Sequence, residues 1–136
     1  MVHALRKLHT SIRPGGTLLD IHPQTQMPGV AVVRDGERID AGVIDWTTDN
    51  IDIRAARRRL ARLEREGLFE AGPRVRFRTA DYFDSVNEWL QLRKERNYTS
   101  TVPGETIRAA RKEMRGGNAK LAVLLRVRAT LYRRRP

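Results

Sequence analysis

The sequence predicts an α/β fold in which helices pack on the faces of a small mixed sheet. Three observations favour this class. Apolar residues at helical spacing alternate along the chain with strand-like runs, one helix stops abruptly before an apolar strand, and no long linker or repeat interrupts the 136 residues. A chain of this length holds one ordinary core, so we expect a single domain over residues 1–136.

Composition excludes several classes of protein. The chain has no cysteine, which excludes a disulfide framework, a thiolate zinc site and a cysteine nucleophile. Its 40% hydrophobic content is too high for a disordered tail. No apolar run approaches the roughly 20 residues that a membrane span needs. We therefore expect a cytoplasmic protein with no membrane partner and no metal site.

The first two elements form a helix and a core strand over residues 1–22. Apolar residues at helical spacing predict a helix over 2–13, and Pro14 ends it because its ring clashes with the preceding turn. Gly15 and Gly16 then allow a tight reversal. The strand that follows, at 17–22, is apolar on both faces, which is typical of a strand buried in an α/β sheet.

Residues 30–45 predict a β-hairpin, since Asp35 and Gly36 form a two-residue turn between apolar segments. A helix then follows over 50–66. It begins at Asp49 or Asn50 and ends before Gly67, which is placed to be its C-terminal cap. Its apolar stripe comprises Ile53, Ala56, Leu60 and Leu63. Its opposite face carries Arg54, Arg58, Arg62 and Arg65.

The rest of the chain, within 50–136, predicts a strand, two helices and a long final strand. Strict alternation over 73–80 indicates a half-exposed strand. Asp84 or Ser85 starts the next helix, and Ser85 with Glu88 fits a capping box. A further helix covers about 105–115, and apolar residues at alternate positions predict a strand over 119–133. We expect four aromatic side chains to lie in the core: Phe69, Tyr82, Phe83 and Trp89.

The segment from Leu5 to Asp20, with its helix, Ile-Arg-Pro-Gly-Gly turn and apolar strand, resembles part of class I S-adenosylmethionine-dependent methyltransferases. In that family a Leu-x-Pro-Gly-Gly turn leads into the fifth strand of a seven-stranded Rossmann-like sheet, and Ile12 takes the place of the leucine here. The resemblance implies that the strands at 73–80 and 119–133 are the sixth and the antiparallel seventh. The sheet order would then be fifth, seventh, sixth.

The cofactor-binding half of that family is absent from this sequence. The family holds S-adenosylmethionine with a glycine-rich turn after its first strand and an acidic residue after its second. The chain contains no G-x-G-x-G pattern, so we expect no cofactor site in this chain alone. Three interpretations follow: a longer enzyme with a mispredicted start, a half that pairs with another chain, or a remnant with a new role.

Asp20 and His22 are the candidate ligand-edge residues. They alternate on one face of the strand at its carboxyl end, which is where open α/β sheets bind ligands. His22 would act as a general base in an intact enzyme, but the structural interpretation, a polar residue before Pro23, is favoured over catalysis. His3 and His9 are expected on the helix surface, because their spacing does not suit a metal site.

Positive charge is concentrated after residue 53. Residues 1–53 have five basic and seven acidic side chains, whereas 54–136 have 22 and nine. If the strands at 73–80 and 119–133 pair, five guanidinium groups would share one sheet face and offer a polyanion-binding surface. These candidates are Arg74, Arg76, Arg78, Arg126 and Arg128. A solvated edge strand protected from aggregation is the favoured alternative.

The sequence therefore leads to two functional hypotheses. The first is a methyltransferase-like half-domain, truncated or partner-dependent and inactive alone, whose strand at 17–22 is covered by a second copy, a complementing chain or a rearranged segment such as the hairpin. The second is an arginine-rich module that binds nucleic acid or serves a regulatory or structural role without enzymatic activity.

Overall fold

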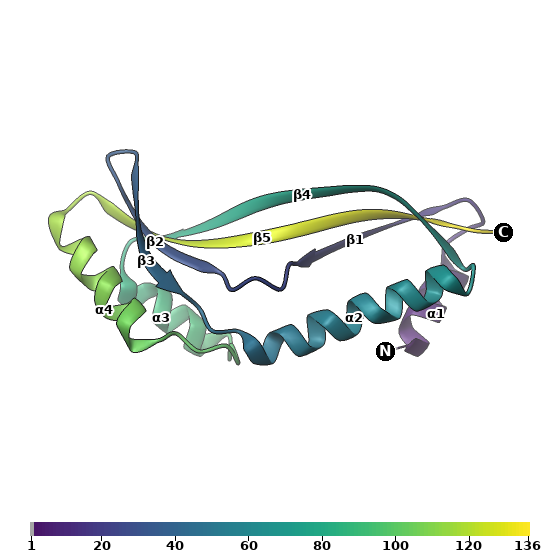
Figure 1. The fold of residues 1–136 in the computed structure, drawn as a ribbon, viewed down its shortest axis with the longest axis horizontal. Helices are drawn as coiled ribbons and strands as arrows, with labels where there is room; N and C mark the ends of the chain where they lie inside the picture. The colour runs from purple at the N-terminus through teal and green to yellow at the C-terminus, as the bar shows by residue number, and fades with distance from the viewer. Residues whose placement is uncertain (1) are drawn as a thin grey trace. The chain divides into compact units, whose positions relative to one another are not determined.

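The computed structural model describes residues 2–136, and its elements follow the predicted order of helix, strand, hairpin, helix, strand, two helices and strand (Figure 1). The helices are α1 (Val2–Ser11), α2 (Thr47–Arg65), α3 (Val86–Glu95) and α4 (Gly104–Glu113), with a 3-10 turn at Met114–Gly116. The strands are β1 (Thr17–Pro23), β2 (Gly29–Arg34), β3 (Glu37–Val43), β4 (Phe69–Phe83) and β5 (Ala119–Arg134).

The five strands form an open antiparallel sheet, so the fold is α/β with an antiparallel rather than a mixed sheet. β5 pairs with β1 through its C-terminal half and with β2 through its N-terminal half, and β4 also pairs with β5. The predicted neighbour order of the strands at 17–22, 119–133 and 73–80 is therefore confirmed as β1–β5–β4. No parallel pair results, because β5 runs opposite to its neighbours and a two-residue turn joins β2 to β3.

The chain divides into two compact units, each with its own hydrophobic cluster. Unit 1 comprises residues 1–24, 52–77 and 127–136, and unit 2 comprises residues 25–51 and 78–126. This division does not test whether residues 1–136 fold as one domain, so the single domain stays a prediction.

Unit 1 is built on the turn that the sequence predicted at Pro14, Gly15 and Gly16. Gly15 has a φ of 74°, and a Cβ on Gly16 would lie 2.7 Å from the Ile12 side chain and 2.8 Å from the Arg13 carbonyl oxygen. Both glycines are therefore required by the geometry. The turn closes against the end of β5, and the core beside it contains Leu60, Leu63, Phe69 and Tyr132.

One face of the unit 1 sheet is exposed, contrary to the expectation of a strand buried on both sides. Leu18 of β1 packs toward the helices, but Leu19 and Ile21 are each 57% exposed. Val75 and Phe77 of β4 are exposed too, so the predicted half-burial of that strand is wrong. The reason is that α2 lies on one side of these strands, and within the described residues no helix packs on the other. The sequence pattern records the apolar face but not whether anything covers it.

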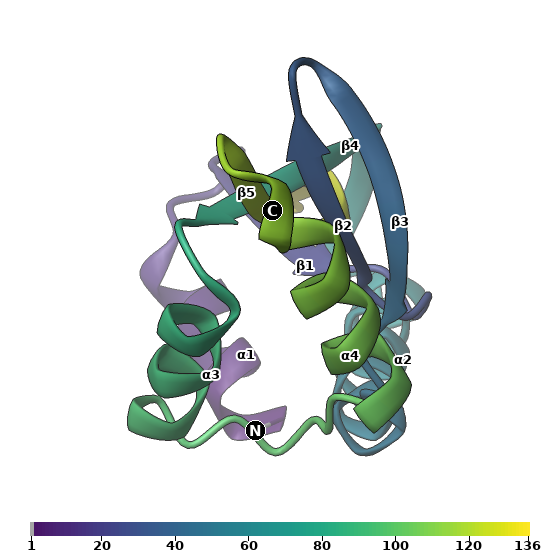
Figure 2. The same ribbon diagram turned by 90° about the vertical axis from the view of Figure 1, so that its left-hand side faces the viewer.

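Unit 2 contains the predicted hairpin. Asp35 and Gly36 have φ values of 50° and 81°, as a two-residue turn between twisted strands requires. α4 packs on the hairpin and on α3, as Figure 2 shows. The core beneath contains Val30, Val32, Ala41, Ile44, Val86, Trp89, Ala110 and Leu121.

Local signals at helix ends are largely confirmed. Gly67 ends α2 with a φ of 73°, and the Leu68 N–H donates to the Leu63 carbonyl. The predicted start of this helix is wrong: it begins at Thr47, because the Asp45 carboxylate accepts the Thr47 N–H and hydroxyl. Tyr82 is 61% exposed, so its assignment to the core is also wrong, since it follows the exposed stretch of β4.

A candidate anion-binding cleft in unit 1

Asp20 and His22 lie on the helix-facing side of β1, opposite Thr130 and Arg128 of β5. His22 Nδ1 lies 2.8 Å from Asp20 Oδ2, and His22 Nε2 lies 3.2 Å from Arg128 Nη2. Because Asp20 and His22 alternate on one face of β1, their side chains are in contact. Arg128 is a third member of this group, which the sequence did not predict.

The contacts of His22 define its protonation. A guanidinium group can only donate, so Nε2 must accept from Arg128, and Nδ1 must carry the proton that is donated to Asp20. Through this hydrogen bond His22 anchors Arg128. In this arrangement neither ring nitrogen is free to take a proton from a substrate.

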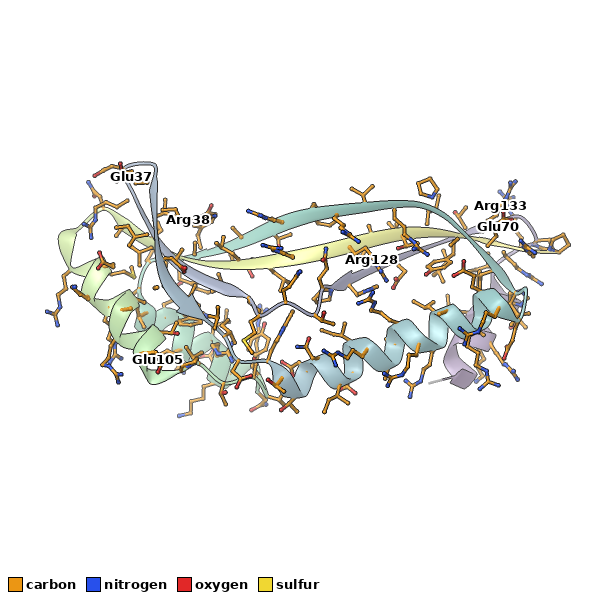
Figure 3. All side chains as sticks on the ribbon, viewed as in Figure 1. Glu37, Arg38, Glu70, Glu105, Arg128 and Arg133 are labelled. Atoms are coloured by element: carbon orange, nitrogen blue, oxygen red, sulfur yellow. The ribbon has the colours of Figure 1, made fainter. Side chains whose placement is uncertain are left out.

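Beside this contact lies a cleft of about 370 Å³ between α2 and the strands. Arg128 and Tyr132 come from β5, and Arg74 comes from β4, while α2 supplies the rest of the wall. Figure 3 shows the Arg128 side chain between β5 and α2. The lining residues from α2 are Arg54, Arg57, Arg58, Leu60, Ala61 and Glu64.

Positive charge dominates the cleft. Five guanidinium groups line it and only one carboxylate, that of Glu64. Burial lowers the pKa of Arg128, and repulsion by Arg57 and Arg74 lowers that pKa further. The side chains of Arg57 and Arg74 have no ion pair or hydrogen bond to any residue that the structure describes. The cleft thus holds more positive than negative charge, since Glu64 and the nearby Asp20 offset only part of the charge of its five guanidinium groups.

Tyr132 forms part of the base of the cleft and is 4% exposed. Burial raises the pKa of its phenol, and the nearby carboxylates of Asp20 and Glu64 raise it as well, against the opposing effect of Arg74 and Arg128. The phenol is consequently protonated at neutral pH and can donate a hydrogen bond.

The predicted five-arginine face is only partly assembled. Arg74 and Arg128 share the cleft, whereas Arg76, Arg78 and Arg126 do not line it. Arg78 and Arg126 belong to unit 2. The arginines of α2 complete the cleft, whereas the sequence places Arg54 and Arg58 only on the helix face opposite the apolar stripe. Helical spacing of four residues could have linked those two, but the approach of the helix to β4 was not readable from sequence.

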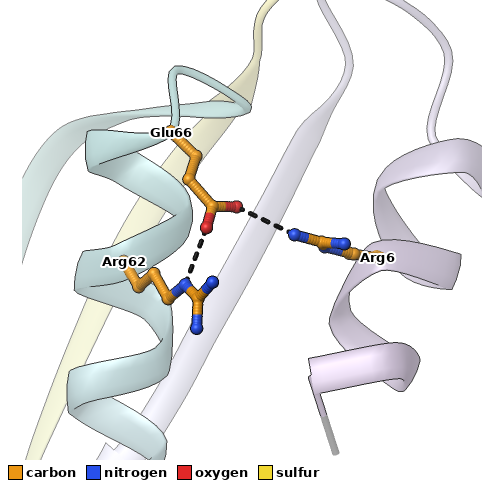
Figure 4. Close-up of polar contacts among 3 residues, drawn as sticks. All are labelled: Arg6, Arg62 and Glu66. Carbon is orange, nitrogen blue, oxygen red and sulfur yellow. Dashed lines mark hydrogen bonds and ion pairs between the residues drawn. The ribbon is translucent and has the colours of Figure 1, made fainter.

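Arg62 of α2 forms an ion pair and does not belong to the cleft. Glu66 accepts from Arg62 at 2.7 Å and from Arg6 of α1 at 3.5 Å, as Figure 4 shows. The hydrogen bond from Arg62 is the main cause that lowers the pKa of Glu66. This exposed network joins two helices of unit 1, and it removes Arg62 from the unpaired charges of the helix.

The other histidines do not form a site with His22. His9 is half-buried and meets Phe69 edge-on at 5.2 Å, so the expectation of an ordinary surface residue is wrong. It packs there because α1 lies next to the start of β4. The side chain of His3 lies outside the described residues. Among the side chains that the structure describes, no group of three or more acidic or histidine residues is placed to hold a metal ion.

A second cleft, of about 340 Å³, lies in unit 2 around the start of α3. Its lining has one carboxylate, Asp84, which contacts Lys120, and only two guanidinium groups, those of Arg111 and Arg115. It therefore presents a weaker field than the cleft of unit 1.

Comparison of this chain with family models, with curated proteins and with solved structures finds no match. No helix in the described part of the chain is long and apolar enough to cross a membrane.

Proposed function

We propose that the chain is a methyltransferase-like half-domain that works only when a partner completes it. The order of β1, β5 and β4 supports this proposal, because a Rossmann-like methyltransferase has the same order in its fifth, seventh and sixth strands. The connections fit as well: α1 leads into β1 through the Pro-Gly-Gly turn, and α2 precedes β4. The hairpin and the pair α3–α4 are then insertions into that pattern.

The observation that carries the proposal is the uncovered sheet of unit 1. Five apolar side chains are exposed on the face of this sheet that points away from α2. We name this set the open apolar face: Leu19, Ile21, Val75, Phe77 and Leu131. β1 pairs only with β5, so its second edge has no strand partner among residues 2–136. The hairpin pairs with β5 and does not cover this edge. An apolar face beside a free edge is what a sheet shows when its neighbouring layer and strand come from elsewhere.

S-adenosylmethionine does not fit the cleft that is present. The cofactor carries a positively charged sulfonium group, and five guanidinium groups would repel it. No step of a methyl transfer is therefore assigned to Asp20, His22 or the cleft arginines. Isothermal titration with S-adenosylmethionine should give no binding up to about 1 mM, a threshold that corresponds to about −4 kcal/mol. Micromolar binding by this chain alone would overturn the half-domain proposal.

Association provides the second test of the half-domain. We expect light scattering to give a mass above the 15.6 kDa of one chain, because a second copy covers the open apolar face when no complementing chain is present. A chain that stays at 15.6 kDa at all accessible concentrations, with its apolar face uncovered, would contradict the proposal.

Nucleic-acid binding is the second candidate function, and the exposed arginines of β4 favour it. A triple Arg74→Ala, Arg76→Ala, Arg78→Ala variant should lose affinity for an oligonucleotide duplex, and the affinity of the unmodified chain should fall steeply with salt. Absence of binding to any polynucleotide at low salt would eliminate this candidate.

A further inference from the structure

The cleft of unit 1 combines exposed arginines of α2 and β4 with a half-buried arginine of β5 that is held in place. Three elements converge on it, and its volume of about 370 Å³ falls within the range of small-molecule sites. Arg128 is fixed from behind, since His22 accepts from one of its terminal nitrogens while Asp20 orients the imidazole. A guanidinium that is held in place loses less entropy when it binds a ligand.

The charge of the cleft indicates an anion. Five arginines face one glutamate, and Arg57 and Arg74 each repel Arg128. A ligand with several negative charges would relieve the repulsion that these two guanidinium groups exert on Arg128.

Phosphate chemistry matches these donors better than a single carboxylate does. Guanidinium groups bind phosphate oxygens through paired hydrogen bonds, and several guanidinium groups can share the oxygens of one diphosphate. The protonated phenol of Tyr132 adds a further donor at the base. Glu64 is the one acidic side chain in the wall, and it is a ready acceptor for a hydroxyl group on the same ligand.

We propose that this cleft binds a compact, multiply charged phosphate anion of the diphosphate class, held by Arg57, Arg74 and Arg128. The compactness follows from the volume of about 370 Å³ and from Arg76 of the same unit, which does not line the cleft although it lies two residues from Arg74 on β4. The site is independent of the half-domain proposal. It needs neither S-adenosylmethionine nor a partner chain.

Isothermal titration at low salt with inorganic pyrophosphate tests the site. Arg57→Ala and Arg74→Ala should each weaken binding about tenfold or more, because each removes a charge-assisted contact. Both positions are exposed, so these variants should fold, and circular dichroism checks this. The matched controls are Arg65→Ala on the same helix and Arg76→Ala on the same strand, which change charge equally outside the cleft and should leave the affinity nearly unchanged.

Two further binding measurements distinguish a site for a free diphosphate from a surface that binds the phosphates of a nucleic acid. Inorganic phosphate should bind more weakly than pyrophosphate, and a duplex oligonucleotide should not displace pyrophosphate at equal phosphate concentration. The proposal is overturned if pyrophosphate does not bind at low salt. It is also overturned if Arg76→Ala weakens binding as much as Arg74→Ala, or if the duplex competes effectively, since each outcome indicates an extended polyanion surface.

Discussion

At the scale of single residues, His22 shows how two neighbours determine the state of a titratable side chain. Arg128 supplies only donors, and Asp20 supplies only acceptors when ionised, so the imidazole must carry its proton on Nδ1. We expect long-range nitrogen-15 correlation spectra to show the tautomer with a hydrogen on Nδ1 and none on Nε2. An Arg128→Met variant should lose this preference. A His22 that is protonated on Nε2 in the unmodified chain would contradict the contact.

Tyr132 gives a prediction about pH and stability. Burial raises the pKa of its phenol in the folded chain, so the unfolded chain ionises first when the pH passes about 10. The stability contributed by the neutral phenol is fully present below that pH and is lost as the pH rises toward the folded-state value. Asp20, Glu64, Arg74 and Arg128 face the phenol from the surrounding elements.

Urea unfolding at several pH values between about 8 and about 11 checks this prediction, with Tyr132→Phe as the comparison. The free energy of unfolding should fall more steeply above pH about 10 in the unmodified chain than in the variant. Parallel pH profiles would show that the phenol ionises equally in both states.

At the scale of an element, α3 depends on its N-terminal cap. Ser85 Oγ accepts the Glu88 N–H at 3.0 Å, and the Glu88 carboxylate accepts from the Asp84 N–H at 2.7 Å, one residue before the position expected for a capping box. Ser85→Ala should destabilise the chain by about 1 kcal/mol. Ser85→Asp keeps a hydrogen-bond acceptor, so its free energy of unfolding should stay within a few tenths of a kcal/mol of that of the unmodified chain. If the unmodified chain, Ser85→Ala and Ser85→Asp unfold at the same urea concentration, the cap contributes nothing to stability.

The hairpin depends on Gly42, where β3 passes the buried Thr106 of α4. Its φ is 129°, and a Cβ would lie 2.4 Å from Thr106 Oγ1. Gly42→Ala should destabilise the chain by about 2 to 4 kcal/mol, because backbone strain and overpacking add. Gly36→Ala is the control: its φ is also positive, but nothing lies within 4 Å, so about 1 kcal/mol is expected. Thermal unfolding that ranks the two variants equally would exclude a role for the contact with Thr106.

At the scale of the whole molecule, the sequence predicts elements better than it predicts their surroundings. Periodicity and turn residues located every helix and strand, because these signals act within a few residues. They could not show that Leu19 and Phe77 are exposed, since burial depends on what packs against a face and not on its pattern. Two residues that line the cleft, Arg74 and Arg128, are among the arginines that the sequence suggests for polyanion binding. Asp20 and His22 lie on one strand, so the sequence pattern pairs them. The contact of His22 with Arg128 joins residues 106 positions apart, and a local pattern cannot show it.

The two surfaces of unit 1 should respond to salt in opposite directions. The open apolar face and the arginine cleft lie on opposite sides of the same strands, because residues alternate between faces along β4 and β5. Association through the apolar face brings two chains of charge +11 together, and salt screens their repulsion. Anion binding in the cleft is attractive and is weakened by the same screening.

Raising salt from about 50 mM to about 500 mM should therefore increase the mass measured by light scattering while it weakens pyrophosphate binding. An Ile21→Lys, Val75→Lys double variant should stay near 15.6 kDa at both salt concentrations, because each lysine places a charge in the apolar face. Ile51→Lys is the matched control, since Ile51 is 63% exposed but lies in unit 2, outside that face. If salt dissociates the assembly instead, electrostatic contacts hold it, and the apolar face is not the surface through which the chains associate.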